Sequence, residues 1–173
     1  MRLAFKFSVL TRIQIKVVPG QNITIREARA EDVETLLRFE QGVVIAERPF
    51  DPTLKPHPNY YYDIQQMIAD PLVQLVVAER NGQLIGCGYA RIEKAKPYAK
   101  HEHQAYLGFM YVEPACRGRN INHMIIENLK EWCIKQGITE MRLDVYNDNL
   151  AAIKAYEKAG FTRLMIHMRM GLS

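Results

Sequence analysis

Hydrophobic residues recur with two different periods along this chain, and the two periods alternate. Strands place successive side chains on opposite faces and helices repeat every 3.6 residues, so the alternation predicts strands and helices in turn. Apolar or alternating segments predict strands at residues 23–26, 72–79, 84–92, 104–112, 141–145 and 162–170. Helical spacing predicts helices near residues 31–40, 59–70, 118–136 and 149–159. This order predicts an α/β fold of the α+β type, with a mixed, mostly antiparallel central sheet and helices on both faces.

Local residue chemistry predicts where these elements begin and end. Asn81-Gly82 lies between two apolar runs and predicts a tight hairpin. Residues 47–58 contain four of the eight prolines and predict a stiff loop. Asn59 is expected to cap the helix that follows, Gly137 to end the long helix, and Gly108 to allow a bulge in its strand.

The first twenty residues carry the whole net charge of +4, because they contain four basic residues and no acidic one. The remaining residues have 19 basic and 19 acidic side chains, so the body lacks the basic surface of a nucleic-acid-binding protein. We therefore expect a basic extension at residues 1–20 and one domain at residues 21–173. Alternation of Ile13, Ile15 and Val17 favours an extra edge strand, and an unstructured start is the alternative. Lys6 and Arg12 interrupt the apolar stretch, which argues against a signal peptide.

The composition also excludes several classes of protein. No apolar run approaches the roughly 18 residues of a membrane helix, and no H-E-x-x-H motif predicts a metal site. Cys87, Cys116 and Cys133 form no C-x-x-C pair and no even framework, which favours a reducing, cytoplasmic location. The expected partners exclude nucleic acid and membranes, and the oligomeric state stays open, with a homodimer among the alternatives.

The segment from Asn149 to Phe161 carries the most specific pattern, Asn-x-x-Ala-x-x-x-Tyr-Glu-Lys-x-Gly-Phe. Seven residues turn a helix through about 700°, so Asn149 and Tyr156 share one face, with the small Ala152 between them. A plain amphipathic helix would explain Tyr156 as a packed core aromatic. The whole pattern, however, closely resembles the GNAT superfamily of acyl-CoA N-acyltransferases, and the order of elements from residue 22 to about 170 resembles that family too.

A second similarity lies between residues 110 and 122, where a strand, a turn and a helix start follow one another. Amides at a helix N-terminus bind phosphate, and the resemblance implies that this turn wraps the pyrophosphate of coenzyme A. Asn120 and Asn122 stand where the family has small residues; Asn122 either crowds the phosphate or donates a hydrogen bond to it. The residues expected to contact the cofactor are Met110, Val112, Arg117, Gly118, Arg119, Asn120, Ile121, Asn122, Asn149 and Tyr156.

The resemblance implies direct attack of an amine on the thioester of acetyl-CoA, without a covalent enzyme intermediate or a metal. Pantetheine would lie where the strand ending at Val112 parts from the strand around Leu143. Tyr156 matches the family's general acid, which protonates the departing thiolate. Cys116 lies beside Arg117 and Arg119 near a helix start, but no histidine partner supports it as a nucleophile.

The general base is expected to be Glu102, acting through a water relay. Period two along the strand places Glu102, Gln104, Tyr106 and Gly108 on one side, running towards Val112. The alternatives are Glu93 in the same role and Glu102 as a plain loop carboxylate.

The acceptor, a small-molecule or peptide amine, is expected between the first two helices and the proline-rich loop. Glu47, Arg48, Phe50, Asp51 and Tyr60–Tyr62 lie there. The function predicted is acetyl-CoA-dependent N-acetyl transfer. A non-catalytic acyl-CoA-binding or regulatory module on the same fold is the alternative.

Overall fold

The central sheet has six strands in the order β1-β2-β3-β4-β5-β6. The computed structural model describes residues 16–17 and 22–172. Neighbouring strands are antiparallel from β1 to β5, and β6 is parallel to β5. The strands are β1 (Lys16–Val17), β2 (Ile23–Glu27), β3 (Val73–Arg80), β4 (Gln83–Lys94), β5 (His103–Val112) and β6 (Met141–Arg142). The expected mixed, mostly antiparallel sheet is confirmed.

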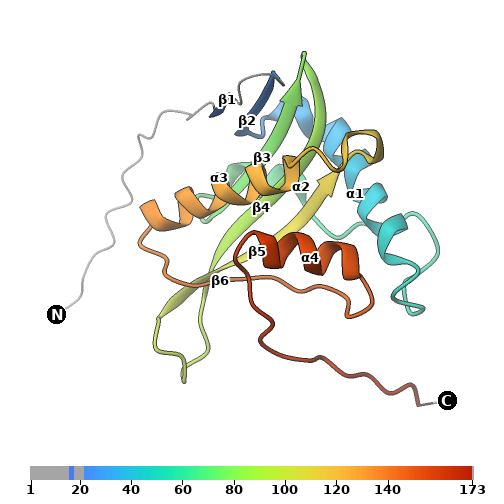
Figure 1. The fold of residues 1–173 in the computed structure, drawn as a ribbon, viewed down its shortest axis with the longest axis vertical. Helices are drawn as coiled ribbons and strands as arrows, with labels where there is room; N and C mark the ends of the chain where they lie inside the picture. The colour runs from blue at the N-terminus through green and yellow to red at the C-terminus, as the bar shows by residue number, and fades with distance from the viewer. Residues whose placement is uncertain (1–15, 18–21, 173) are drawn as a thin grey trace.

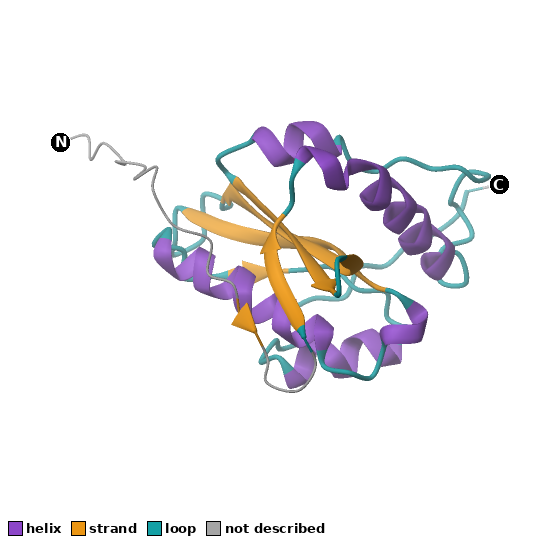
Figure 2. Cartoon of the chain, turned by 90° about the horizontal axis from the view of Figure 1, so that it is seen from above, coloured by secondary structure: helices purple, strands orange, loops and turns teal. Residues whose placement is uncertain are grey.

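Helices cover both faces of this sheet (Figures 1 and 2). They are the short 3₁₀ helices η1 (Ala30–Asp32) and η2 (Pro114–Cys116) and the α-helices α1 (Val33–Glu47), α2 (Ile64–Ala69), α3 (Ile121–Lys135) and α4 (Leu150–Lys158). Two separate hydrophobic clusters result, one on each face. In the first, the α3 cluster, Ile125 and Leu129 of α3 pack with Val76 and Leu107 on one face. In the second, the α1 cluster, Leu36 and Phe39 of α1 pack with Val77 and Tyr89 on the other face.

The hairpin between β3 and β4 forms as its sequence predicts. Arg80 pairs with Gln83, and the two residues between them have positive φ angles, 53° at Asn81 and 78° at Gly82. Asparagine and glycine tolerate this backbone better than other residues, and its twist matches that of the strands. Of the extra edge strand expected near residues 13–17, Lys16 and Val17 pair with β2, and its remaining residues lie outside the described part.

The second helix begins later than predicted. The side chain of Asp63, not that of Asn59, accepts the capping hydrogen bond, from the Gln66 amide at 3.0 Å. Asn59 is instead held by Gln41 of α1, whose Nε2 donates to its main-chain carbonyl at 2.7 Å. Tyr61 therefore lies in the irregular segment before α2 rather than on its inner face.

Two predicted strands are also wrong in extent. The strand expected at residues 141–145 pairs only over Met141 and Arg142. Residues 162–170 form no strand in the described structure and leave the body of the fold after α4 (Figure 1). Their alternating pattern is that of a strand, but no neighbouring strand pairs with them.

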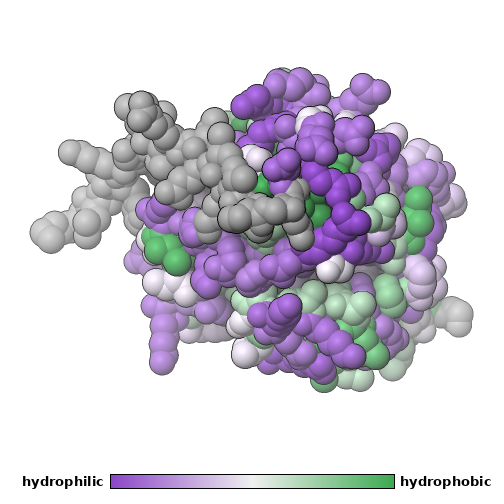
Figure 3. Space-filling view, turned by 45° about the horizontal axis from the view of Figure 1, so that its top comes forward, coloured by the Kyte–Doolittle hydropathy of each residue, from purple (hydrophilic) through white to green (hydrophobic). Residues whose placement is uncertain are grey.

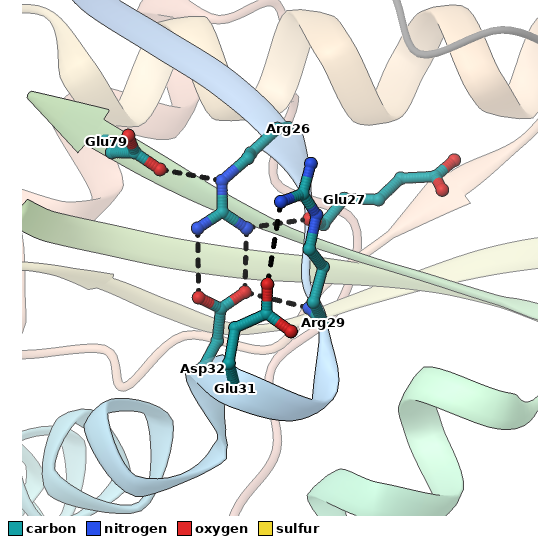
Figure 4. Close-up of polar contacts among 6 residues, drawn as sticks. All are labelled: Arg26, Glu27, Arg29, Glu31, Asp32 and Glu79. Carbon is teal, nitrogen blue, oxygen red and sulfur yellow. Dashed lines mark hydrogen bonds and ion pairs between the residues drawn. The ribbon is translucent and has the colours of Figure 1, made fainter. Parts of the chain in front are cut away.

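An ion-pair cluster joins the start of α1 to the sheet (Figure 4). Arg26 of β2 donates to both oxygens of Asp32, at 2.7 and 2.9 Å, and to Glu79 of β3 at 2.7 Å. Asp32 also accepts the Arg29 amide at 2.8 Å. Burial raises the pKa of Asp32, but the hydrogen bonds from Arg26 and the Arg29 amide outweigh it, so this pKa lies below its usual value. The cluster fixes where α1 leaves the sheet.

The face in Figure 3 is mostly hydrophilic, with its hydrophobic residues in separate patches. Within the described residues, no helix combines the length and apolarity needed to cross a membrane. The same residues contain no group of three or more His, Cys, Asp or Glu side chains arranged to hold a metal ion.

Candidate active site

A bulge in β5 changes which face its side chains occupy. Cys87 pairs with Tyr111 and Tyr89 with Gly108, so β5 has one residue more than β4 between these pairs. Phe109 takes the left-handed conformation there, with φ of 53°. A bulky residue with positive φ is unusual and often marks a functional site. Gly108 makes the close approach to β4 possible, because a Cβ there would lie 2.6 Å from the Tyr89 hydroxyl.

The extra residue interrupts the row of side chains expected to lead from Glu102 to Val112. Before the bulge, Leu107 packs in the α3 cluster and Tyr106 against the α1 cluster. After it, Met110 and Val112 pack against the α3 cluster, so even-numbered residues have changed face. Period two therefore fails as a guide across this strand.

The edge of β5 beyond Tyr106 has no strand beside it among the described residues. β6 pairs with β5 only at Ala105–Met141 and Tyr106–Arg142, and the two chains then part. The main-chain groups on this edge, from residue 107 to Val112, face the resulting gap without a ladder partner. An unpaired strand edge can bind an extended ligand through its N–H and C=O groups.

The turn after β5 presents the N-terminus of a fifteen-residue helix. Gly118 and Asn120 have φ angles of 74° and 64°, so α3 begins at Ile121 and not at residue 118 as predicted. The Asn120 side chain makes no capping hydrogen bond. Arg117 donates from Nε to the Val112 carbonyl at 3.1 Å, which joins the turn to the end of β5. The first amides of α3 thus have no side-chain cap, and such amides bind anions well.

The other members of this turn differ in exposure. Arg119 is exposed and Ile121 is buried, while Asn122 is half-buried in the first turn of α3. Ile121 therefore contributes to the core with its side chain and offers only its amide to a ligand. Asn122 is the second residue of α3, close to the first amides of the helix.

Helix α4 places Tyr156 against the α3 cluster. The predicted cap is confirmed, because the Asn149 side chain accepts the Ala152 amide at 3.2 Å. Tyr156 packs against the α3 cluster, as Met110, Val112 and Leu143 also do. Its ring centroid is 6.0 Å from that of Phe161, with the rings at 73°. Burial, followed by the negative charge of Glu47, raises the pKa of Tyr156 to about 12.

Glu47, at the last turn of α1, is the carboxylate whose charge acts on Tyr156, although 109 residues separate them. Its side chain is half-buried, and burial raises its pKa, as does nearby Asp51, against a hydrogen bond from Tyr61. Tyr146 donates to Asp51 at 3.3 Å, and its ring lies 5.9 Å from that of Phe50. The sequence predicts Glu47 only as one of several residues near the acceptor. Helix or strand periodicity does not predict that Glu47 and Tyr156 lie within electrostatic reach of each other.

A buried carboxylate holds the tyrosine segment against α1. Glu40 is fully buried and accepts the amides of Tyr61 and Tyr62, at 2.5 and 2.9 Å. The Tyr62 ring stacks on Phe109 of the bulge, with centroids 4.8 Å apart. The bulge of β5 and the acceptor-side segment are therefore in direct contact.

Glu102 and Glu93 lie at the other end of β5. Glu102 is exposed in the hairpin loop, where its carbonyl accepts the Ala95 amide at 2.8 Å. The Glu93 side chain accepts from Gln104 at 2.8 Å. Ten residues of strand separate Glu102 from Val112, a span of about 33 Å. The role of Glu102 stays a prediction.

Comparison with known proteins decides the family. The model of the acetyltransferase (GNAT) family matches residues 40–161. This chain belongs to that family. An acetyltransferase of Pectobacterium atrosepticum is 31% identical over 120 residues, which is 69% of this chain and 78% of that protein. An IAA acetyltransferase of Azospirillum brasilense is 27% identical over 103 residues, and the match spans 60% of this acetyltransferase but only 63% of the relative.

Solved structures agree on the fold. A predicted acetyltransferase from Clostridium acetobutylicum, crystallised with acetyl-CoA, superposes with a TM-score of 0.66 at 21% identity. The alignment covers 86% of this acetyltransferase and 96% of that chain. At this identity the similarity supports the architecture. The details of the site follow from this chain's own residues.

Proposed function

We propose that this acetyltransferase moves an acetyl group from acetyl-CoA to a primary amine by direct attack in a ternary complex. The observation that carries the proposal is the parting of β5 from β6 beside the core on which Tyr156 packs. An open strand edge and a half-buried phenol that packs on the same cluster suit a thioester held along the strand and protonated from the helix.

The residues present fit coenzyme A at both of its ends. The unpaired edge that ends at Met110 and Val112 has main-chain groups available for the amides of pantetheine. The N-terminus of α3 has no side-chain cap, so its first amides are available to a pyrophosphate. The space beside Gly118 is open, because a Cβ added there would meet no atom within 4 Å. Arg119 is exposed and able to contact a phosphate. The acetyl-CoA found with the Clostridium protein supports the same cofactor here.

In the proposed reaction the amine nitrogen bonds to the thioester carbon and gives up a proton to the general base, the C–S bond breaks, and Tyr156 donates its proton to the sulfur. An amide of the β5 edge beyond the bulge would stabilise the oxyanion. A pKa of about 12 keeps Tyr156 protonated at neutral pH. Against a free thiol of pKa about 8.5, complete transfer is uphill by about 5 kcal/mol. Tyr156 therefore acts best by sharing its proton as the thiolate forms.

Glu47 and Asp51 suit the acceptor better than a neutral site would. An alkyl ammonium of pKa about 10.4 is mostly protonated at pH 7 and must lose a proton before attack. Glu47 is half-buried, has a raised pKa and is electrostatically coupled to Tyr156. Glu102 remains the predicted base through a water relay.

The location proposed is cytoplasmic. All three cysteines are free and buried, as a reducing compartment favours.

The proposal is tested by thermal unfolding with acetyl-CoA, together with thiol release over a panel of small-molecule and peptide amines. A ligand that binds only the folded state at 100 times its Kd stabilises it by about 2.7 kcal/mol. We expect both a raised Tm and amine-dependent thiol release. An unchanged Tm at millimolar acetyl-CoA would contradict the assignment of acetyl-CoA as the cofactor. A raised Tm with no turnover on any amine would favour the non-catalytic module.

A further inference from the structure

The carboxylate of Glu47 takes a hydrogen bond from a tyrosine of another segment. Glu47 lies in the last turn of α1, and Tyr61, whose side chain makes this hydrogen bond, precedes α2. Among the described residues, no lysine, arginine or histidine forms an ion pair with Glu47. The Tyr61 hydroxyl therefore offsets part of what burial costs this half-buried carboxylate.

The main chain of Tyr61 is fixed by a second carboxylate of the same helix. Glu40 is fully buried, and its Oε1 accepts the Tyr61 amide at 2.5 Å and the Tyr62 amide at 2.9 Å. Seven residues, about two turns, separate Glu40 from Glu47, so both lie on the same face of α1. Tyr61 is thus bound to α1 at both of its ends, at the amide by Glu40 and at the hydroxyl by Glu47.

The aromatic rings around Tyr61 restrict its direction further. The Tyr61 ring meets the Tyr62 ring edge-on, with centroids 5.9 Å apart and planes at 86°. Tyr62 in turn stacks on Phe109 of the bulge and meets Tyr89 edge-on, with centroid distances of 4.8 and 5.7 Å. The position of Tyr61 is therefore set by α1 and by β5 together.

Other titratable and charged groups face Glu47 from the elements around it. They are Arg48 and Asp51 after it in the chain, Tyr62 before α2, Tyr146 before α4, and Tyr156 of α4. Arg48 is directed elsewhere, since its guanidinium donates to the Lys55 carbonyl at 2.9 Å. Burial and Asp51 raise the pKa of Glu47 and favour its neutral form, whereas the Tyr61 hydrogen bond lowers this pKa and favours the ionised form that a base needs.

We propose that Tyr61 is a positioning residue for Glu47: held between Glu40 and Glu47, it binds one oxygen of the Glu47 carboxylate and leaves the other for the ammonium group of the acceptor. The inference rests on the acetyl transfer proposed above, with Glu47 as its base. In that step an N–H bond of the ammonium breaks and the proton passes to Glu47. The nitrogen keeps the electron pair and attacks the thioester carbon with it. Tyr61 keeps its own proton, because burial and the charge of Glu47 raise its pKa.

The first test is a titration of the Glu47 carboxyl group by ¹³C NMR, which needs neither cofactor nor acceptor. The signal is assigned by its loss in Glu47→Gln. Tyr61 is 39% exposed, so Tyr61→Phe leaves no buried cavity. Loss of a hydrogen bond to an ionised carboxylate should raise the pKa of Glu47 by about one unit or more in this variant. The matched control is Tyr62→Phe, whose lost hydroxyl bonds the main chain of Phe109 and should shift this pKa by less than about half a unit. An unchanged pKa of Glu47 in Tyr61→Phe would overturn the proposal.

The second test is the pH dependence of kcat/KM for the amine. The ratio of kcat/KM in Tyr61→Phe to that of the unmodified protein cancels the titration of the amine, which is common to both. We expect this ratio to be about 0.1 or less below the acid limb and to rise to a plateau above it. Tyr62→Phe should give the same ratio at every pH, as a change in packing does.

The possible failures of the second test are distinguishable. Thiol release by the unmodified protein with a ratio in Tyr61→Phe that is the same at every pH would mean that Tyr61 only packs; this result would overturn the inference and leave the acetyl transfer standing. No thiol release by the unmodified protein with any amine would contradict the proposed function and this inference together.

Discussion

Replacing Tyr156 by phenylalanine separates proton donation from packing at one residue. The variant keeps the ring that lies 6.0 Å from Phe161 and removes the hydroxyl alone. If Tyr156 is the acid, kcat should fall by about 10²–10⁴, the usual contribution of a positioned acid. Affinity for coenzyme A should change by less than about tenfold, because one neutral hydrogen bond contributes about 1 kcal/mol.

The raised pKa of Tyr156 also predicts a pH dependence. Burial and the charge of Glu47 raise the pKa of Tyr156 to about 12, so we expect this residue to keep its proton well above neutral pH. We therefore expect no loss of kcat from Tyr156 between pH 7 and about 10. A tyrosine at its ordinary pKa of about 10 would already be half ionised at the upper end.

The assay is single-turnover thiol release with a verified amine acceptor, so that chemistry and not product release is observed. Acyl donors whose leaving thiolate is less basic should narrow the difference between the two proteins, because they need less protonation. Tyr98→Phe, at a side chain 82% exposed, controls for the loss of a phenol as such. Equal single-turnover rates for Tyr156→Phe and the unmodified protein would refute the role, and Tyr156 would then be a packed aromatic.

Three further predictions concern the acceptor, the cofactor and the fold. Glu47→Gln should lower kcat/KM for the amine by about 10² or more, and it should remove an acid limb of the pH profile that lies above the ordinary carboxyl pKa of about 4.3. Glu102→Gln tests the predicted water relay. A larger loss of kcat/KM in Glu102→Gln than in Glu47→Gln would favour the prediction from the sequence. Asn122→Gly should raise affinity for coenzyme A in a titration if the side chain crowds the phosphate and lower it if the amide is a ligand; no change would place Asn122 outside the site. Asp32→Asn should lower the free energy of unfolding in urea by about 2–3 kcal/mol at pH 7, against about 0.5 kcal/mol for the exposed Glu31→Gln. Because the pKa of Asp32 is lowered by folding, its contribution is complete above the unfolded value of about 4 and is lost as the pH falls through the folded value; a difference that persists unchanged at pH 2 would contradict this account.

The sequence predicted correctly those features that depend on neighbouring residues alone, namely a tight turn, a helix cap and an apolar helix face. Asn81-Gly82 closes its hairpin, Asn149 caps its helix, and the α3 stripe faces the core. The same reasoning misplaced the start of α2, because Asn59 and Asp63 are both good caps. In the structure Gln41 holds the main chain of Asn59 and the Asn59 side chain donates to the Lys55 carbonyl, while Asp63 caps the helix. The contact with Gln41 joins residues far apart in sequence, which a local pattern does not contain.

Strand extent and the acid–base residues were harder for a related reason. Residues 141–145 and 162–170 have strand patterns, but a strand exists only where a neighbour pairs with it. The row from Glu102 to Val112 assumed a period of two, which the extra residue at Phe109 breaks. Glu47 and Tyr156 are brought into electrostatic reach by packing across the fold.

The bulge at Phe109 determines how β5 packs both against α1, which carries Glu47, and against the α3 cluster. Because it shifts the phase of β5, Tyr111 turns towards α1, where its ring lies 4.8 Å from that of Phe39. Room for this ring depends on Gly42 of α1, since a Cβ there would lie 2.5 Å from Tyr111. The same phase shift directs Met110 and Val112 to the opposite side. We therefore expect a deletion of one residue here to displace both the helix that carries Glu47 and the strand edge that faces the gap, which are the surfaces proposed above for the amine and for coenzyme A.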